Sequence, residues 1–483
     1  MNKKGLNLLF LVLLLGVIGL PYTNDVAIDQ RVARNVILLQ SQDQSQIRSQ
    51  LATVGDDMQW NRIYGGDDDD WASSVIETVD GGFIFTGATA SFGKGINYDS
   101  WLVKTDAYGV IEWNQTYGSL GDDLTYSVIQ TSDGGYALAG WTGIPMAGGD
   151  SWLVKTDAYG VMEWDQTYGN EWYTISKSII QTADGGYMLA GYILSLETNN
   201  YDAWLMKTDA NGDIQWKLTY GGPGTDKFFS VIQTDDSGYA FAGYTTSFGM
   251  GEEDFWLVKT DARGVVEWTQ TYGDAGEEQA YGITQTTDGG FAIIGHTTSF
   301  DAVVSDVWLV NTDAHGVMKW NKLYGDSLLE WDKLYGGSSW DEAYSIIQTA
   351  EGGFILAGQT HSFEGHKDAW LVKLDTYGVM EWNKVVGGSE DDIANKVIQV
   401  TDGSYVLAGS TFSFGAGGRD AWLVKIGPPS IASSTRFIYN MAVFILFASF
   451  TIIRLWKKAP YIYGLIMLTA ATIAILKLWK KRL

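Results

Sequence analysis

Acidic side chains recur at two fixed places along this 483-residue sequence. The first set lies two residues before the tryptophan of a repeated Trp-Leu-Val-Lys string or its variants: Asp99, Asp150, Asp202, Asp254, Asp306, Asp368 and Asp420. The second set lies six residues after the first residue of Tyr-Gly-Gly-like segments: Asp70, Asp123, Asp226, Glu278, Asp341 and Asp392, with Thr174 in the remaining copy. Carboxylates are hard oxygen ligands, so a ring of them on one rim could bind Ca²⁺ or a cationic ligand. Alternatively, each could accept backbone N–H groups of its own loop, and recurrence in every copy favours this structural role.

Other chemistry is sparse. The chain has no cysteine, which excludes disulfides, zinc–thiolate sites and cysteine nucleophiles. Among four histidines, His361 and His366 form a cluster with Glu364 and Asp368, which is a weak metal signal and more typical of a solvated loop. No Ser/His/Asp set can be identified, so the sequence singles out no catalytic residue. Three segments break the repeat symmetry and deserve inspection for a site: 141–145, 171–173 and 361–366. Asn114 begins an Asn-Gln-Thr glycosylation sequon.

The chain is strongly acidic, because it has 32 Lys and Arg residues against 57 Asp and Glu residues, which gives a net charge of −25. Lys3, Lys4 and eight bases after residue 430 account for ten of the 32, which leaves residues 25–429 with 22 bases against all 57 acids. Such a surface repels phosphate backbones, so we exclude nucleic acid as a partner.

The residues between the two ends form one repeat written seven times. Its marker tryptophans are separated by 51, 52, 52, 52, 62 and 52 residues: Trp101, Trp152, Trp204, Trp256, Trp308, Trp370 and Trp422. Each unit predicts four short strands, as at 127–131, 135–142, 152–157 and 161–169, with an Asp-Gly-Gly hairpin turn between the first two. Antiparallel four-stranded units of this length, repeated four to eight times, are typical of a β-propeller.

The ends of the array predict how the ring closes. A lone fourth strand near Trp60–Tyr64 precedes the first complete unit, and the last unit stops after its third strand at Ile426. We therefore predict an all-β, seven-bladed propeller over residues 58–427, closed by three strands plus one. Trp331 duplicates the outer strand around Trp320, and we expect this to be an insertion on the rim rather than a partner-binding edge strand. A polar residue on each first strand is expected to bond the neighbouring blade: Glu77, Gln130, Gln181, Gln233, Gln285, Gln348 and Gln399.

The chain ends predict membrane attachment. Lys3 and Lys4 precede fifteen apolar residues, so residues 1–24 are expected to be a signal peptide or N-terminal anchor, followed by a polar linker over 25–57. After a linker at 428–436, the apolar segment 437–456 predicts a transmembrane helix, and 461–479 predicts a second transmembrane or an interfacial helix. We expect the propeller to lie on the extracellular side of the cell membrane.

The Asp-Ala-x-Gly-x-x-x-Trp element resembles the docking motif of quinoprotein-type (PQQ-like) propeller repeats: Asp106–Trp113, Asp157–Trp164, Asp261–Trp268 and Asp313–Trp320. The turn is one residue shorter than in that family and lacks its Thr-Gly pair. The unit is also similar to tandem propeller repeats of secreted bacterial and archaeal surface proteins, some attached to glycan-degrading enzymes.

These resemblances imply the fold and leave two functions open. The first is a membrane-anchored, non-catalytic binding or scaffold module for a protein, glycan or cation, with Ca²⁺ as the possible ion. The alternative is an extracellular enzyme, either glycan-active like a glycoside hydrolase or quinoprotein-like. A quinoprotein would need a cofactor-stacking tryptophan and calcium ligands in the channel, and the sequence singles out neither.

Overall fold

The computed structural model describes residues 58–427 except 94–96, 145–147, 170–172, 196–197, 301, 303, 326–339 and 362–365. The predicted signal or anchor, both linkers, both membrane helices and the duplicated strand at Trp331 lie outside the described residues. Within the part that is described, no helix is long and apolar enough to cross a membrane.

Seven antiparallel sheets of four strands each make up the described chain. Blades 1 to 3 comprise β2 (Asp70–Glu77), β3 (Phe83–Thr89), β4 (Asp99–Thr105) and β5 (Ile111–Tyr117); β6 (Asp122–Gln130), β7 (Tyr136–Ile144), β8 (Gly148–Thr156) and β9 (Met162–Tyr168); and β10 (Thr174–Gln181), β11 (Tyr187–Leu194), β12 (Tyr201–Thr208) and β13 (Ile214–Tyr220). Blades 4 and 5 comprise β14 (Asp226–Gln233), β15 (Tyr239–Thr245), β16 (Asp254–Thr260) and β17 (Val266–Tyr272); and β18 (Glu278–Gln285), β19 (Phe291–Thr297), β20 (Asp306–Thr312) and β21 (Met318–Tyr324). Blade 6 comprises β22 (Asp341–Gln348), β23 (Phe354–Thr360), β24 (Asp368–Leu374) and β25 (Met380–Val386).

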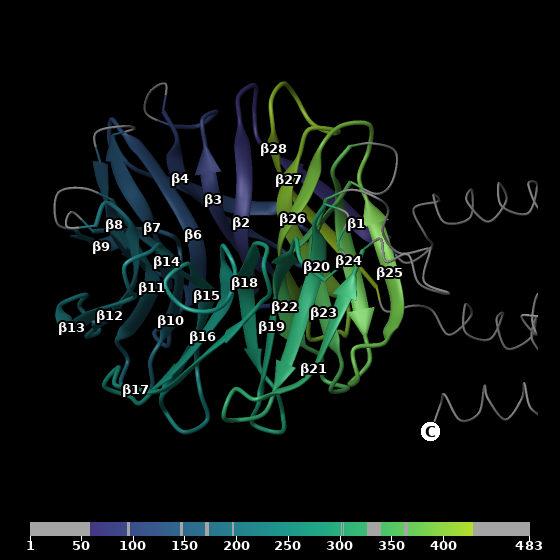
Figure 1. The fold of residues 1–483 in the computed structure, drawn as a ribbon. Helices are drawn as coiled ribbons and strands as arrows, with labels where there is room; N and C mark the ends of the chain where they lie inside the picture. Colours follow the sequence, from purple (N-terminus) through teal and green to yellow (C-terminus); the bar gives the residue numbers. More distant parts are fainter. Residues whose placement is uncertain are drawn as a thin grey trace, which may run out of the picture. The chain divides into compact units, whose positions relative to one another are not determined.

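Blade 7 confirms the predicted closure. Its strand order is β1 (Met58–Tyr64), β28 (Asp420–Ile426), β27 (Tyr405–Thr411) and β26 (Asp392–Gln399), so the earliest described strand completes the last sheet. The first strands of successive blades contact one another, and β26 contacts β2, which joins the seven blades in a ring. Figure 1 shows these inner strands near the middle and outer strands such as β13, β17 and β25 at the edge.

The apolar core lies between the blades. Each marker tryptophan is buried against its neighbours, with Trp101, Trp308 and Trp370 at most 2 % exposed. The tyrosine that ends a fourth strand crosses to the next blade, where the Tyr168 hydroxyl donates a hydrogen bond of 2.6 Å to the Gly212 carbonyl. Tyr64 and Tyr324 repeat this bond to Gly109 and Gly378. These contacts explain why the tyrosine and the turn glycine recur together.

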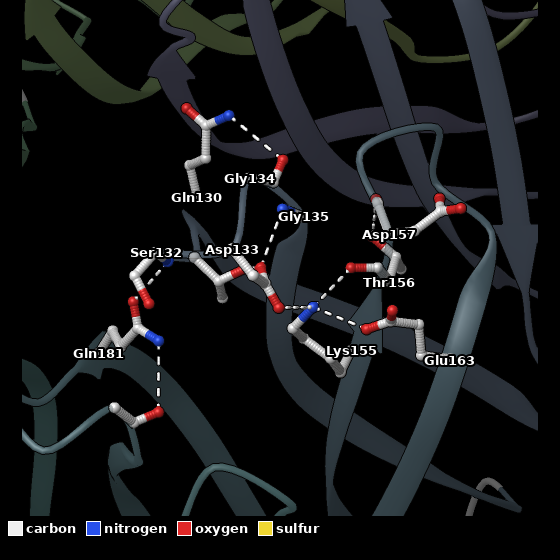
Figure 2. A network of polar contacts seen from close by, with 12 residues as sticks. Gln130, Ser132, Asp133, Gly134, Gly135, Lys155, Thr156, Asp157, Glu163 and Gln181 are labelled. Carbon is white, nitrogen blue, oxygen red and sulfur yellow. Dashed lines mark hydrogen bonds and ion pairs between the residues drawn. The ribbon is translucent and has the colours of Figure 1, made fainter.

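Recurring polar residues of the repeat connect strands within a blade and also join one blade to the next (Figure 2). The ammonium group of Lys155 forms ion pairs of 2.9 Å with Asp133 in the hairpin turn and 2.8 Å with Glu163 on the fourth strand. The side-chain oxygen of Gln181 accepts the Ser132 amide hydrogen of the preceding blade at 2.8 Å. Gln285, Gln348, Gln399 and Glu77 accept equivalent bonds. The predicted bonding of these side chains between blades is therefore confirmed at five of the seven positions.

Candidate functional site

Each blade has two ends. We call the end that carries the connections from one blade to the next, such as 65–69, the loop face. The end that carries the hairpin turns, such as 80–82, is the turn face. Every first strand runs from the loop face to the turn face and contains a β-bulge after its third or fourth residue, at which the pairing register with the second strand shifts. A bulge leaves one residue unpaired and re-aims its side chain.

A glycine on each second strand makes room for this bulge. In blade 4, a Cβ atom added to Gly243 would overlap the carbonyl oxygen of Lys227 and lie 2.9 Å from the Cα of Phe228. Backbone atoms of the two residues before the bulge would crowd an added Cβ in the same way in the other six blades, at Gly87, Gly140, Gly191, Gly295, Gly358 and Gly409. The invariant glycine therefore allows the first strand to turn its bulged residue out of the ladder.

The bulged residues differ from blade to blade, although the flanking positions repeat. They are Ser73, Tyr126, Lys177, Phe229, Tyr281, Tyr344 and Asn395. All seven line one central cavity of about 120 Å³. Variation at one point of an otherwise repeated structure is what a ligand site requires, because a single ligand does not share the sevenfold symmetry of the ring.

The variation continues toward the loop face on the second strand. The residue that follows the invariant glycine pairs two positions before each bulge, and it is Ala88, Trp141, Tyr192, Tyr244, His296, Gln359 or Ser410. The residue before each third-strand aspartate varies as widely: Tyr98, Gly149, Tyr201, Glu253, Ser305, Lys367 and Arg419. We call these two sets, together with the bulged residues, the channel mouth.

Aromatic rings from four adjacent blades contact one another at the channel mouth. Phe229 lies with its ring centroid 6.2 Å from that of Tyr192, 5.9 Å from Tyr244 and 5.2 Å from Tyr281. Tyr281 in turn contacts Tyr344 at 5.4 Å and stacks on His296 at 5.7 Å. Blades 3 to 6 therefore supply a continuous aromatic wall.

Polar groups at the channel mouth include several buried atoms without a hydrogen-bond partner among the described residues. They are Trp141 Nε1, His296 Nδ1, Ser305 Oγ, Gln359 Oε1 and Arg419 Nε. Buried polar atoms are normally paired, since leaving one unpaired costs about 1–3 kcal/mol. Five such atoms belong to residues of the channel mouth.

Charged groups at and beside the channel mouth are desolvated. The Lys177 ammonium lies 3.4 Å from the centre of the Tyr126 ring, and burial, with a smaller contribution from the Lys227 charge, lowers the pKa of Lys177 to about 7. Burial also lowers the pKa of Lys227, whose ammonium lies 4.6 Å from the centre of the Tyr201 ring. On the acidic side, burial raises the pKa of Glu253, which accepts a hydrogen bond from Gln279.

The two predicted acidic sets meet in pairs at blade boundaries on the loop face. A Cβ atom on Gly118 would collide with the carboxylates of both Asp99 and Asp123, and Gly221, Gly273, Gly387 and Gly65 occupy equivalent positions. The paired acids there are Asp202 and Asp226, Asp254 and Glu278, Asp368 and Asp392, and Asp420 and Asp70. At the two remaining boundaries, Gly169 lies against Asp150 and Gly325 against Asp306, whereas Asp341 begins β22.

These acids accept backbone hydrogen bonds from their own loops. Asp226 Oδ2 accepts the Gly222 amide hydrogen at 2.8 Å, and Asp254 Oδ2 accepts that of Met250 at 3.0 Å. Burial, with smaller contributions from Asp70 and Asp69, raises the pKa of Asp420 to about 6. No group of three or more His, Asp or Glu side chains within the described ranges is arranged to hold a metal ion. The observed contacts fit the structural role of the acidic sets, and we derive no calcium chemistry from them.

The remaining predicted positions lie on several parts of the blades. Asn114 is exposed on β5, where its Oδ1 accepts a hydrogen bond of 3.3 Å from Trp101, beside an outer hollow of about 350 Å³. Glu364 of the predicted His361 cluster lies outside the described residues. Trp141 belongs to the channel mouth and stacks on Tyr173 at 6.2 Å.

Comparisons with known proteins add no family. The sequence matches no protein-family model and no curated protein. Similar solved structures include a protein of unknown function from Dyadobacter fermentans, at 10 % identity with a TM-score of 0.44, over 77 % of this chain and 99 % of that one. The Neurospora crassa Pan2 WD40 domain matches at 10 % identity with a TM-score of 0.44, over 73 % of this chain and 88 % of that one. A glucose dehydrogenase also matches, at 10 % identity with a TM-score of 0.37, over 63 % of this chain and 96 % of that one. Likeness at this level carries no conclusion about activity, and the seven-bladed fold rests on the sheet topology given above.

Proposed function

We propose that this protein is a non-catalytic binding module that takes a glycan at the channel mouth. The observation that carries the proposal is the gathering of the residues that vary between blades around one end of the channel. Residues that hold the ring together, by contrast, recur in nearly every blade. A site of this kind, concave and rich in aromatic rings with a few convergent polar groups, is typical of small-molecule recognition.

The chemistry of the channel mouth supports a glycan in particular. Sugar rings present apolar C–H faces that pack on aromatic side chains, and the wall around Phe229 and Tyr281 offers such faces. Sugar hydroxyls both donate and accept hydrogen bonds. The unpartnered atoms provide donors at Trp141 and Arg419 and an acceptor at Gln359.

Removing one ring of the wall tests this proposal. We expect Tyr281→Ala to weaken binding of the best glycan at least tenfold, because an aromatic contact contributes about 1.4 kcal/mol. Binding is measured with the full-length chain in detergent on a glycan array, followed by calorimetry. Tyr281→Phe keeps the ring and should lose less affinity, although the Tyr281 hydroxyl donates to Gln279 Oε1 at 2.7 Å.

Tyr159→Ala is the matched control, because Tyr159 is 73 % exposed on the turn face. It should leave affinity unchanged. Equal affinity for Tyr281→Ala and wild-type protein, with both folded by near-ultraviolet circular dichroism, would place the glycan elsewhere. A chain that binds nothing on the array would remove the glycan from the proposal.

We further propose that the propeller is displayed on the extracellular side of the cell membrane. The support is the sequence at both ends, where apolar segments are flanked by Lys and Arg. The full chain is expected to stay with membranes after carbonate extraction, and protease added to intact cells is expected to digest the propeller. Protection from protease until the cells are opened would reverse this orientation.

A further inference from the structure

The central cavity is lined by hydrogen-bond donors. Ser127 Oγ accepts the amide hydrogen of Ile179 in the next blade, and Ser178 Oγ accepts that of Val231 in the same way. A hydroxyl whose oxygen accepts a bond still has its own hydrogen to donate. Asn395 Nδ2 donates to the Ala72 carbonyl. Since no Asp or Glu lines the cavity, its walls offer donors without a carboxylate to receive them.

Two lysines line the same cavity, Lys177 and Lys396. Neither forms an ion pair with any residue that the structure describes. The lysines near the ends of the third strands, by contrast, all form ion pairs with acids. They are Lys104, Lys155, Lys207, Lys259, Lys373 and Lys425. In a chain with a net charge of −25, carboxylates are abundant, yet within the described ranges none forms an ion pair with these two ammonium groups.

From these observations we infer that the cavity is a binding site for one small oxyanion, a carboxylate, phosphate or sulfate group, for which the lysines and serine hydroxyls of the lining are the donors. Its volume of about 120 Å³ equals that of roughly four water molecules and accommodates such a group. The oxyanion would accept hydrogen bonds from the serine hydroxyls and supply negative charge to the two lysines.

The energetics agree with this assignment. Burial lowers the pKa of both Lys177 and Lys396, so both ammonium groups are costly in the empty cavity. An anion beside them restores the charged form. Because the remainder of the domain is acidic and repels anions at a distance, saturable binding of an anion requires this local group of cations and donors.

The test is equilibrium dialysis of the full-length chain in detergent against radiolabelled sulfate, phosphate or acetate, at constant ionic strength set with NaCl. We expect one equivalent of at least one of these anions to bind saturably. Preference for acetate indicates a carboxylate group as the natural ligand, and preference for sulfate or phosphate indicates a tetrahedral oxyanion. Lys177→Met and Lys396→Met should each weaken this binding at least tenfold.

Lys217→Met is the matched control, because Lys217 is exposed on β13 and its replacement removes the same charge from the outer rim. It should bind the anion as wild type does. Absence of saturable binding for all three anions, or binding that survives in both Lys177→Met and Lys396→Met, would overturn the inference. The cavity shares the bulged residues with the channel mouth, but anion binding and glycan affinity are measured in separate assays, so either proposal can fail alone.

Discussion

Deleting residues 57–66 is expected to abolish cooperative unfolding of the propeller. These residues contain β1, the outer strand of blade 7, which pairs with β28. Asn61 accepts a hydrogen bond of 3.3 Å from the Trp422 side chain, and Tyr64 is buried in the core between blades 7 and 1. Its hydroxyl also donates to the Gly109 carbonyl of blade 1 at 2.8 Å. The deletion removes the contacts that tie the last blade to the first and leaves β28 as an unpaired edge.

Thermal unfolding followed by tryptophan fluorescence, together with size-exclusion chromatography, measures the effect. The deleted chain should melt without a sharp transition or aggregate, because an exposed edge strand pairs with other chains. Deletion of residues 44–53 is the length-matched control and should melt as the wild type does. A sharp transition at the wild-type temperature after loss of 57–66 would contradict closure by three strands plus one.

The fold could be predicted from the sequence because its determinants are local and repeated. The Asp-Gly-Gly turns and the marker tryptophans set the strands of each blade. The strand around Trp60 has no first three strands before it, and the last unit has no fourth strand. Seven complete sheets form only if this strand joins the last unit. The bonds of Gln181 and its equivalents were predictable for the same reason, since a polar residue that recurs on a buried inner strand needs a partner that recurs as well.

The candidate site could not be predicted in the same way. Attention to recurring residues led to Asp254 and the other acids, and in the structure these accept backbone hydrogen bonds at blade boundaries. The channel mouth is formed instead by positions that do not recur, such as Lys177 and Tyr281. Their position depends on a one-residue shift of register, which a strand pattern does not reveal. Alignment of the seven repeats shows them as a variable column on the first strand, and a second variable column lies next to the invariant glycine of the second strand.

That glycine gives the prediction with the largest effect of any single substitution. Gly243→Ala is expected to destabilise the propeller by about 3 kcal/mol or more, because the added Cβ would overlap the Lys227 carbonyl oxygen and lie 2.8 Å from the carbonyl carbon. Both atoms belong to backbone, so no side-chain rotation relieves the contact. The strands can separate only if the bulge in β14 changes, and this would move Phe229 away from the aromatic wall.

The expected result is a lower midpoint of urea unfolding together with weaker glycan binding, because the bulge and the channel mouth are one structure. Gly403→Ala is the control, since an added Cβ there meets no atom within 4 Å and only its positive φ of 83° opposes alanine. That strain costs about 1 kcal/mol and lies in a turn on the turn face, so ligand affinity should be kept. If Gly243→Ala costs no more than Gly403→Ala and binds glycan as wild type does, the glycine is not what permits the bulge, and the variable residues owe their position to another cause.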